Sequence, residues 1–262
     1  MTFIVGLKCS DGLVMCADTL ESDGYTKKYR NKLVNRVIGS EWGVCWGGSG
    51  NAYVVDKFSD KLTQMIGNDS YGRAALEIHA EACLEFIRTQ YSRPCDQIDI
   101  VLSLFGRPLQ IEKGLAPVLG IPEFHLYKGS SESACFASQK EYCCAGMDVT
   151  LAEFVLANTY LRSIKMAEAT RLGIFTTAMM KKYADGVGGE TTVYTHLRGS
   201  DQWSTLSDFE LSVIESDVSV ESAEINMSKF WANSPNRINF SQMTEAEIEV
   251  NRLMQPRPRT KN

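Results

Sequence analysis

The alternation of strand-like and helix-like blocks restricts the fold of this chain more than any other sequence feature. Short β-forming runs separated by turn signals fill the first fifty residues, and the apolar spacing then becomes helical. The same order follows a second time. We expect strands at 3–8, 13–17, 32–38, 42–46, 98–105, 124–128, 134–137, 142–145 and 190–198, and helices at 54–66, 75–86, 151–162 and 165–183. Short connections between the strands favour antiparallel pairing. The blocks predict an α+β fold, a four-layer αββα sandwich in which helices cover two facing sheets.

Composition fits one main domain followed by an extension. The 262 residues, 44% of them hydrophobic, supply a sizeable core, which we assign to residues 1–206. Residues 207–262 are acidic and irregular, and we expect a partly helical extension with a disordered end. Thr244 begins a T-x-x-E capping box that predicts a helix from Thr244 to Met254.

Charge and residue patterns exclude several classes of function. The net charge is -5 and the 27 basic residues are dispersed, so we expect no nucleic-acid partner. No apolar run approaches the roughly 18 residues of a membrane helix, and no signal-peptide core is found, so we expect no membrane partner. The 8 cysteines lack CxxC spacing and are expected to be buried thiols of a cytoplasmic protein. The histidines lack metal-ligand spacing, and we expect no metal and no cofactor.

The first hairpin carries the candidate chemistry. If its turn is centred on Ser10 and Asp11, facing residue numbers sum to about 21, which places Asp18 beside residues 2 and 3. A buried carboxylate there needs a partner, and Lys32 at the start of the third strand can reach the same end of the sheet. Strand geometry therefore predicts that Thr2, Asp18 and Lys32 converge.

A threonine at the chain start can act as a nucleophile. Its hydroxyl needs a nearby base, and a free α-amino group with an unperturbed pKa near 7.7 is one. We therefore expect Met1 to be removed so that Thr2 is exposed. The Lys32 charge would hold the amine pKa down, and Asp18 would keep Lys32 charged. Gly47 and Gly48, in a glycine-rich turn after the fourth strand, would offer backbone N–H groups to an oxyanion.

Several motifs resemble 20S proteasome β subunits and the related bacterial ATP-dependent protease peptidase subunit, which are N-terminal nucleophile (Ntn) hydrolases. The similar segments are Thr2 with Ile4-Val5-Gly6-Leu7-Lys8, Asp11 to Asp18, Lys32-Leu33-Val34, Gly47 to Ala52, and Met166 through Asp185-Gly186-Val187-Gly188-Gly189, within residues 2–197. The resemblance implies a threonine endopeptidase that cleaves unfolded polypeptides or peptides within a homo-oligomeric ring or stacked rings. It also implies that Asp185 supports the threonine, and it leaves open whether an ATP-dependent unfoldase supplies substrate.

Other interpretations remain open at this stage. Gly146 and Gly188 stand where the resembled family has serines near the threonine, which favours a non-catalytic structural subunit as an alternative, and an amidase acting on a small amide is a third reading. The Asp18–Lys32 pair would also suit a purely structural role, and Asp185 would also suit a turn after a helix. We expect Leu20 and Trp46 to line the substrate pocket, although Trp46 would equally suit the core.

Overall fold

The protein has an α+β fold built on antiparallel sheets. The computed structural model describes residues 2–22, 26–38, 42–68, 72–107, 109–110, 118–120 and 122–217. One five-stranded sheet contains, in spatial order, β12 (Tyr142–Gly146), β1 (Phe3–Lys8), β2 (Gly12–Asp18), β13 (Thr191–Leu197) and β14 (Ser204–Thr205). The other contains β11 (Cys135–Gln139), β10 (Glu123–Ser130), β7 (Ile98–Gly106), β6 (Trp42–Gly50) and β5 (Leu33–Ile38). Two short strand pairs are β3 (Leu20–Ser22) with β4 (Lys27–Tyr29), and β8 (Leu109–Gln110) with β9 (Val118–Leu119).

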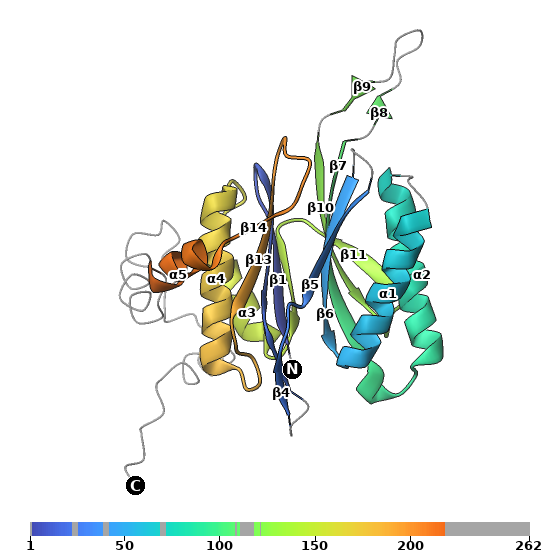
Figure 1. Ribbon diagram of the computed structural model, residues 1–262, viewed down its shortest axis with the longest axis horizontal. Helices are drawn as coiled ribbons and strands as arrows, with labels where there is room; N and C mark the ends of the chain where they lie inside the picture. The colour runs from blue at the N-terminus through green and yellow to red at the C-terminus, as the bar shows by residue number, and fades with distance from the viewer. Residues whose placement is uncertain are drawn as a thin grey trace, which may run out of the picture.

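Helices cover the outer face of each sheet (Figure 1). They are α1 (Ala52–Asn68), α2 (Gly72–Gln90), α3 (Val149–Thr159), α4 (Met166–Tyr183) and α5 (Asp208–Asp217), with a short 3-10 turn at Pro94–Asp96. The first two lie on the sheet that contains β6, where Trp46 and Ile100 pack against Phe58 and Leu84. Burial of these side chains holds the helix pair on the sheet.

The other sheet has its own helical cover. Val5 and Cys16 pack against Ala169 and Ile174 of α4, while α3 contributes Leu156 to the same cluster. A further cluster fills the space between the sheets, and its members include Ile4, Met15, Val101, Leu126 and Ala145. The central strands of the facing sheets are therefore covered on both sides, which explains why β2 is buried along its whole length, whereas the edge strands β11 and β14 are largely exposed.

Helix α5 packs on the helical side of the β1 sheet. Leu211 and Ile214 join the cluster formed with α4, and Ser207 caps the helix by exchanging hydrogen bonds with Glu210. The acidic segment after residue 206 thus begins with a helix that packs on the main body of the protein (Figure 1). The helix expected from Thr244 to Met254 lies outside the described residues.

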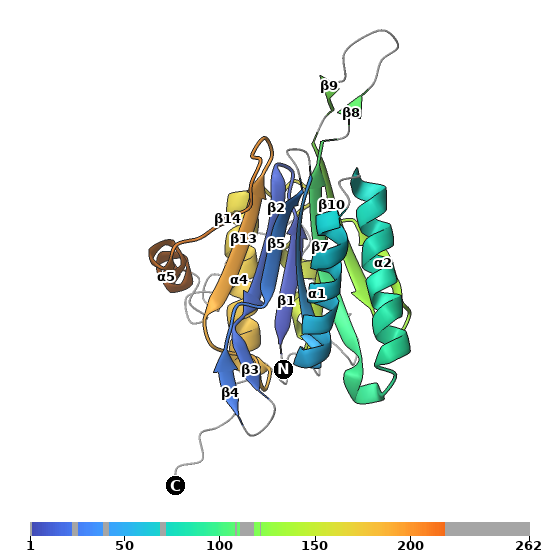
Figure 2. The same cartoon turned by 45° about the vertical axis from the view of Figure 1, so that its right-hand side comes forward.

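Two local expectations were wrong. No strand was expected between residues 17 and 32, but this polar stretch contains the β3–β4 pair, which lies beside the N-terminus at one end of the molecule (Figure 2). The run from Gly47 to Gly50 continues strand β6 and is not a turn, because its backbone pairs with β7 as far as Gly50 and Ile98. Backbone pairing defines both segments, and it leaves little trace in a pattern of side chains.

Two of the cysteines, Cys95 and Cys135, are exposed, which corrects the expectation that all the thiols are buried. Cys135 lies on β11 between Ala134 and Phe136, which pack against the α1-side core, so the cysteine itself points away from that core. Within the described part of the chain, every helix is too short or too polar to traverse a bilayer.

Candidate active site

The hairpin of β1 and β2 brings residue 2 next to Asp18. Ile4 faces Ala17 in the register of the two strands, which confirms the predicted sum of 21. The N–H of Phe3 donates to Oδ1 of Asp18 at 2.8 Å. Thr2 precedes this hydrogen bond directly and is 9% exposed.

Asp18 and Lys32 form a buried ion pair. Nζ of Lys32 lies 2.8 Å from Oδ1 of Asp18, and the two side chains are 5% and 0% exposed. Nζ also donates to the backbone carbonyl of Leu20. Burial lowers the pKa of Lys32, and the charge of Asp18 opposes that effect. The pair therefore places a desolvated cation beside the start of β1.

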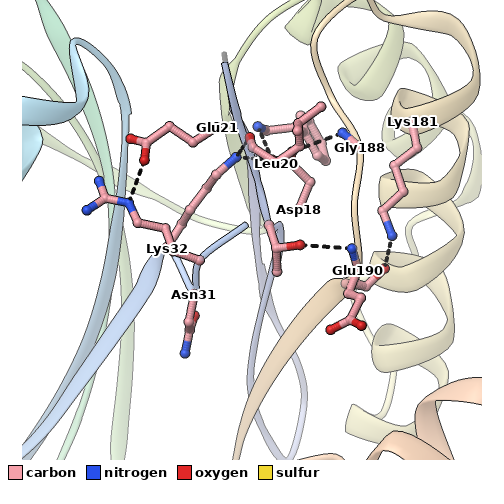
Figure 3. Close-up of polar contacts among 12 residues, drawn as sticks. Asp18, Leu20, Glu21, Asn31, Lys32, Lys181, Gly188 and Glu190 are labelled. Atoms are coloured by element: carbon pink, nitrogen blue, oxygen red, sulfur yellow. Dashed lines mark hydrogen bonds and ion pairs between the residues drawn. The ribbon is translucent and has the colours of Figure 1, made fainter. Parts of the chain in front are cut away.

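The loop between α4 and β13 completes the shell around Asp18 (Figure 3). The N–H of Gly188 donates to Oδ2 of Asp18 at 3.0 Å. The loop is itself fixed on the segment after β2. The N–H of Leu20 donates to the carbonyl of Gly188 at 2.9 Å, the N–H of Thr19 donates to the carbonyl of Glu190 at 3.0 Å, and the N–H of Glu190 donates to Oγ1 of Thr19 at 2.8 Å. Each carboxylate oxygen of Asp18 thus has a donor, which satisfies a group that would otherwise be costly to bury.

A cleft of about 980 Å³ opens at this end of the two sheets. Thr2, Lys32 and Gly48 line it together, and Val55 and Ser59 of α1 form part of its wall. Its other lining residues are Glu21, Thr26, Lys28, Arg30, Asn31, Val34, Arg36, Gly50, Asn51, Ala52, Tyr53, Asp56, Asp60, Thr63 and Cys95. The volume is large enough for a ligand the size of a short peptide.

Arg30 joins two walls of the cleft and was not expected from the sequence. Its Nη1 lies 2.9 Å from Oδ1 of Asp56 on α1, and its Nε lies 3.1 Å from Oε2 of Glu21 on β3. The neighbouring Asn31 donates to the hydroxyl of Tyr194 at 3.1 Å. The sequence signal for these two residues was the polar run that precedes Lys32. That run does not show that Arg30 and Asn31 face a cleft, because their position depends on the β3–β4 pair.

The two glycines of β6 have different surroundings. A Cβ on Gly47 would lie 2.9 Å from Cδ1 of Ile4, between the two sheets, and one on Gly48 would lie 2.7 Å from Cγ1 of Val55. Both therefore permit close packing. β5 begins at Leu33, which pairs with Gly47, so the edge of β6 beyond that point faces the cleft, where Gly48 is a lining residue.

Gly146 is required by the backbone of Thr2. Its φ is +129°, and a Cβ there would lie 2.0 Å from the carbonyl oxygen of Thr2. The adjacent Met147 donates its N–H to the same oxygen at 3.1 Å. The serine implied by the resemblance therefore does not fit at this position without movement of β1, whereas Gly188 acts through its N–H.

Three expected site residues have other surroundings. Trp46 is fully buried in the α1-side core and donates its Nε1 to Ser59 at 3.1 Å, so it does not line the cleft. Leu20 is 8% exposed, and its contribution to the site is the backbone carbonyl that accepts a hydrogen bond from Lys32.

Asp185 is exposed, and among the described residues it has no hydrogen bond to Thr2 or Asp18. It lies just before Gly186, whose φ of +80° belongs to the turn after α4.

Comparison with known proteins identifies the fold. No protein-family model matches the sequence, and no curated protein does. Solved structures do match: Anbu (ancestral beta-subunit) from Yersinia bercovieri has a TM-score of 0.69 at 11% identity, over 89% of this chain and 98% of that chain. An Anbu (Gly-1) mutant from Hyphomicrobium sp. strain MC1 has a TM-score of 0.68 at 14% identity, over 94% and 99%. The helical assembly of the Anbu complex from Pseudomonas aeruginosa has a TM-score of 0.64 at 14% identity, over 89% and 98%.

These matches correct the family resemblance. The similar structures are Anbu proteins, which are proteasome-like but form a family distinct from the proteasome β subunits and the bacterial ATP-dependent peptidase. The motifs of the first hairpin did not separate these families, because strand register alone brings Thr2 and Asp18 together. The identities of 11% and 14% show a shared fold and no more.

Proposed function

We propose that the chain is an N-terminal nucleophile hydrolase, a threonine-type peptidase with Thr2 as its nucleophile, and that its layers are those of the αββα sandwich. One observation carries the proposal: Thr2 lines a cleft together with Lys32, whose ammonium is bound to the buried carboxylate of Asp18. A cation at that place lowers the pKa of a neighbouring amine, which a free Thr2 needs for its α-amino group to act as a base.

The proposed reaction is acyl transfer. Once the residue before Thr2 is removed, the α-amino group takes the proton of the Thr2 hydroxyl, and Oγ1 attacks the carbonyl carbon of the substrate amide. The backbone N–H of Gly48, at the edge of β6 beyond its pairing with β5, stabilises the oxyanion. Successive N–H groups of a strand point to opposite edges, so Gly47 contributes close packing and not a second donor. Collapse breaks the C–N bond, the leaving amine receives the proton, and water then hydrolyses the ester on Thr2. Asp185 enters this scheme only as an outer support, since its side chain is exposed.

We further propose that the active form is a homo-oligomer. The Pseudomonas aeruginosa protein with a similar fold is described as a helical assembly. An oligomer would enclose a cleft that a single chain leaves open to unfolded polypeptides. Light scattering at micromolar concentration tests this directly, and a monomer would contradict it.

The decisive experiment uses protein whose intact mass confirms that it begins at Thr2. This processed protein should cleave fluorogenic peptides. It should also form a covalent adduct at Thr2 with an epoxyketone, which reacts with both the hydroxyl and the free amine. Thr2→Ala should abolish both reactions, while Thr2→Ser should retain partial activity. If the processed protein neither cleaves a broad peptide library nor reacts with the inhibitor, the peptidase proposal is wrong. The chain is then a non-catalytic structural subunit.

A further inference from the structure

A second lysine lies near Asp18 but outside the cleft, and helix α5 binds it. Nζ of Lys181 donates to Oγ1 of Thr191 at 2.7 Å, and that hydroxyl donates to Oε1 of Glu215 at 2.7 Å. Nζ of Lys181 is also 3.6 Å from Oε1 of Glu215. These three residues come from α4, β13 and α5, so the cluster fastens three elements at one point.

The position of the cluster relates it to the candidate site. Lys181 lies near the end of α4 and Thr191 is the first residue of β13, so the two flank the loop that contains Gly188. Thr191 also faces Asp18 directly in the pairing of β13 with β2. The same loop delivers the N–H of Gly188 to Oδ2 of Asp18 (Figure 3).

The cluster is partly withdrawn from water. The side chain of Lys181 is 19% exposed and that of Glu215 is 39% exposed. Thr191 is 4% exposed. Burial lowers the pKa of Lys181, and the charges of Glu215 and Asp18 oppose this effect. Loss of the Glu215 charge therefore leaves a partly buried cation without its main counter-ion, and the side-chain contact between the two loop ends then rests on the Lys181–Thr191 hydrogen bond alone.

We propose that Lys181 and Glu215 are positioning residues, which hold the ends of the Gly188 loop and so couple helix α5 to the Asp18–Lys32 pair. This inference rests on the proposed function for its catalytic consequence. When the loop loosens, Asp18 loses one donor and holds Lys32 less firmly. The Thr2 amine then feels less of the Lys32 charge, so its pKa rises and the neutral base is lost at a higher pH.

The test compares Glu215→Gln and Lys181→Met with Lys181→Arg, which keeps the cation, and with Asp208→Asn, which removes a carboxylate from the exposed first turn of the same helix. In Glu215→Gln and Lys181→Met we expect faster amide hydrogen exchange in residues 186–190. We also expect a loss in kcat of about threefold to tenfold, as for a partly exposed ion pair, with KM unchanged. The acid limb of the pH–rate profile should move to higher pH. Lys181→Arg and Asp208→Asn should match the wild type.

The outcomes separate this inference from the proposed function. Unchanged exchange in residues 186–190 would overturn it, as would faster exchange with kcat and pH profile equal to those of an active wild type. If the processed wild type shows no turnover, the peptidase proposal fails on its own. The pKa of the Thr2 α-amino group, measured by NMR titration, then decides the inference: a higher pKa in Glu215→Gln supports it, and an equal pKa overturns it.

Discussion

Nζ of Lys32 lies 2.8 Å from Oδ1 of Asp18, and both groups are almost completely removed from water. The same oxygen accepts the N–H of Phe3, so the ion pair is joined to the first residue of β1. The pair is thus positioned both to stabilise the end of the sheet and to tune the group that precedes it. The two roles can be separated by mutation.

Loss of one member of the pair should cost more stability than loss of both. Lys32→Met leaves Asp18 buried without its cation, and we expect a loss of about 3 kcal/mol in the free energy of unfolding. The double variant Asp18→Asn/Lys32→Met should lose less, because neither charge remains. Urea denaturation measures both values, and peptide cleavage should be absent in both. Equal destabilisation in the two variants would contradict the prediction.

The glycine next to Thr2 should not tolerate any side chain. Gly146→Ala places a methyl group against the Thr2 carbonyl at a positive φ, and we expect a loss of about 2 kcal/mol or more together with loss of activity. Gly67→Ala on helix α1 is the matched control, since a Cβ added at that position would have no atom within 4 Å. Its effect on the free energy of unfolding should be neutral or slightly stabilising. Similar thermal denaturation temperatures for the two variants would count against this account.

Protein stability should depend on pH through His196, which stacks on Phe105 with ring centroids 3.3 Å apart. Burial lowers the pKa of His196 from 6.5 to about 4. The unfolded state therefore binds more protons between these values, so stability is complete above pH 6.5 and falls as pH decreases toward 4. The loss attributable to this residue is at most about 3 kcal/mol.

His196→Phe should remove this component while keeping a ring against Phe105. The measurement is the difference in unfolding free energy between wild type and variant at pH 7 and at pH 4.5. That difference should move in favour of the variant at the lower pH. A difference that does not change with pH would show that His196 does not titrate in this way.

Asp185 should matter much less than Lys32. Its side chain is exposed and outside hydrogen-bond contact with Thr2, so Asp185→Asn should lower kcat/KM by less than about threefold. Lys32→Ala should reduce it to background. Assays of both variants on one fluorogenic peptide give the ratio. A loss for Asp185→Asn as large as that for Lys32→Ala would require a conformation in which Asp185 reaches the threonine.

Much of the fold could be predicted because its long elements have strong local patterns. The helices α1, α2 and α4 follow apolar spacing, and strands such as β7 and β13 follow β-forming runs between turns. The β3–β4 pair and the strand character of Gly47 to Gly50 could not be predicted in this way. Both depend on backbone pairing with partners that the sequence does not indicate.

The sequence by itself determined that Thr2 and Asp18 lie together, since a tight hairpin fixes its own register over a few residues. Only the tertiary structure decided what surrounds that pair. Gly188 reaches Asp18 across 170 positions in the chain, and Lys181 and Glu215 meet at Thr191 only because α4, β13 and α5 pack together. Such contacts depend on where whole elements are placed, and the packing of buried side chains between sheets and helices sets that placement.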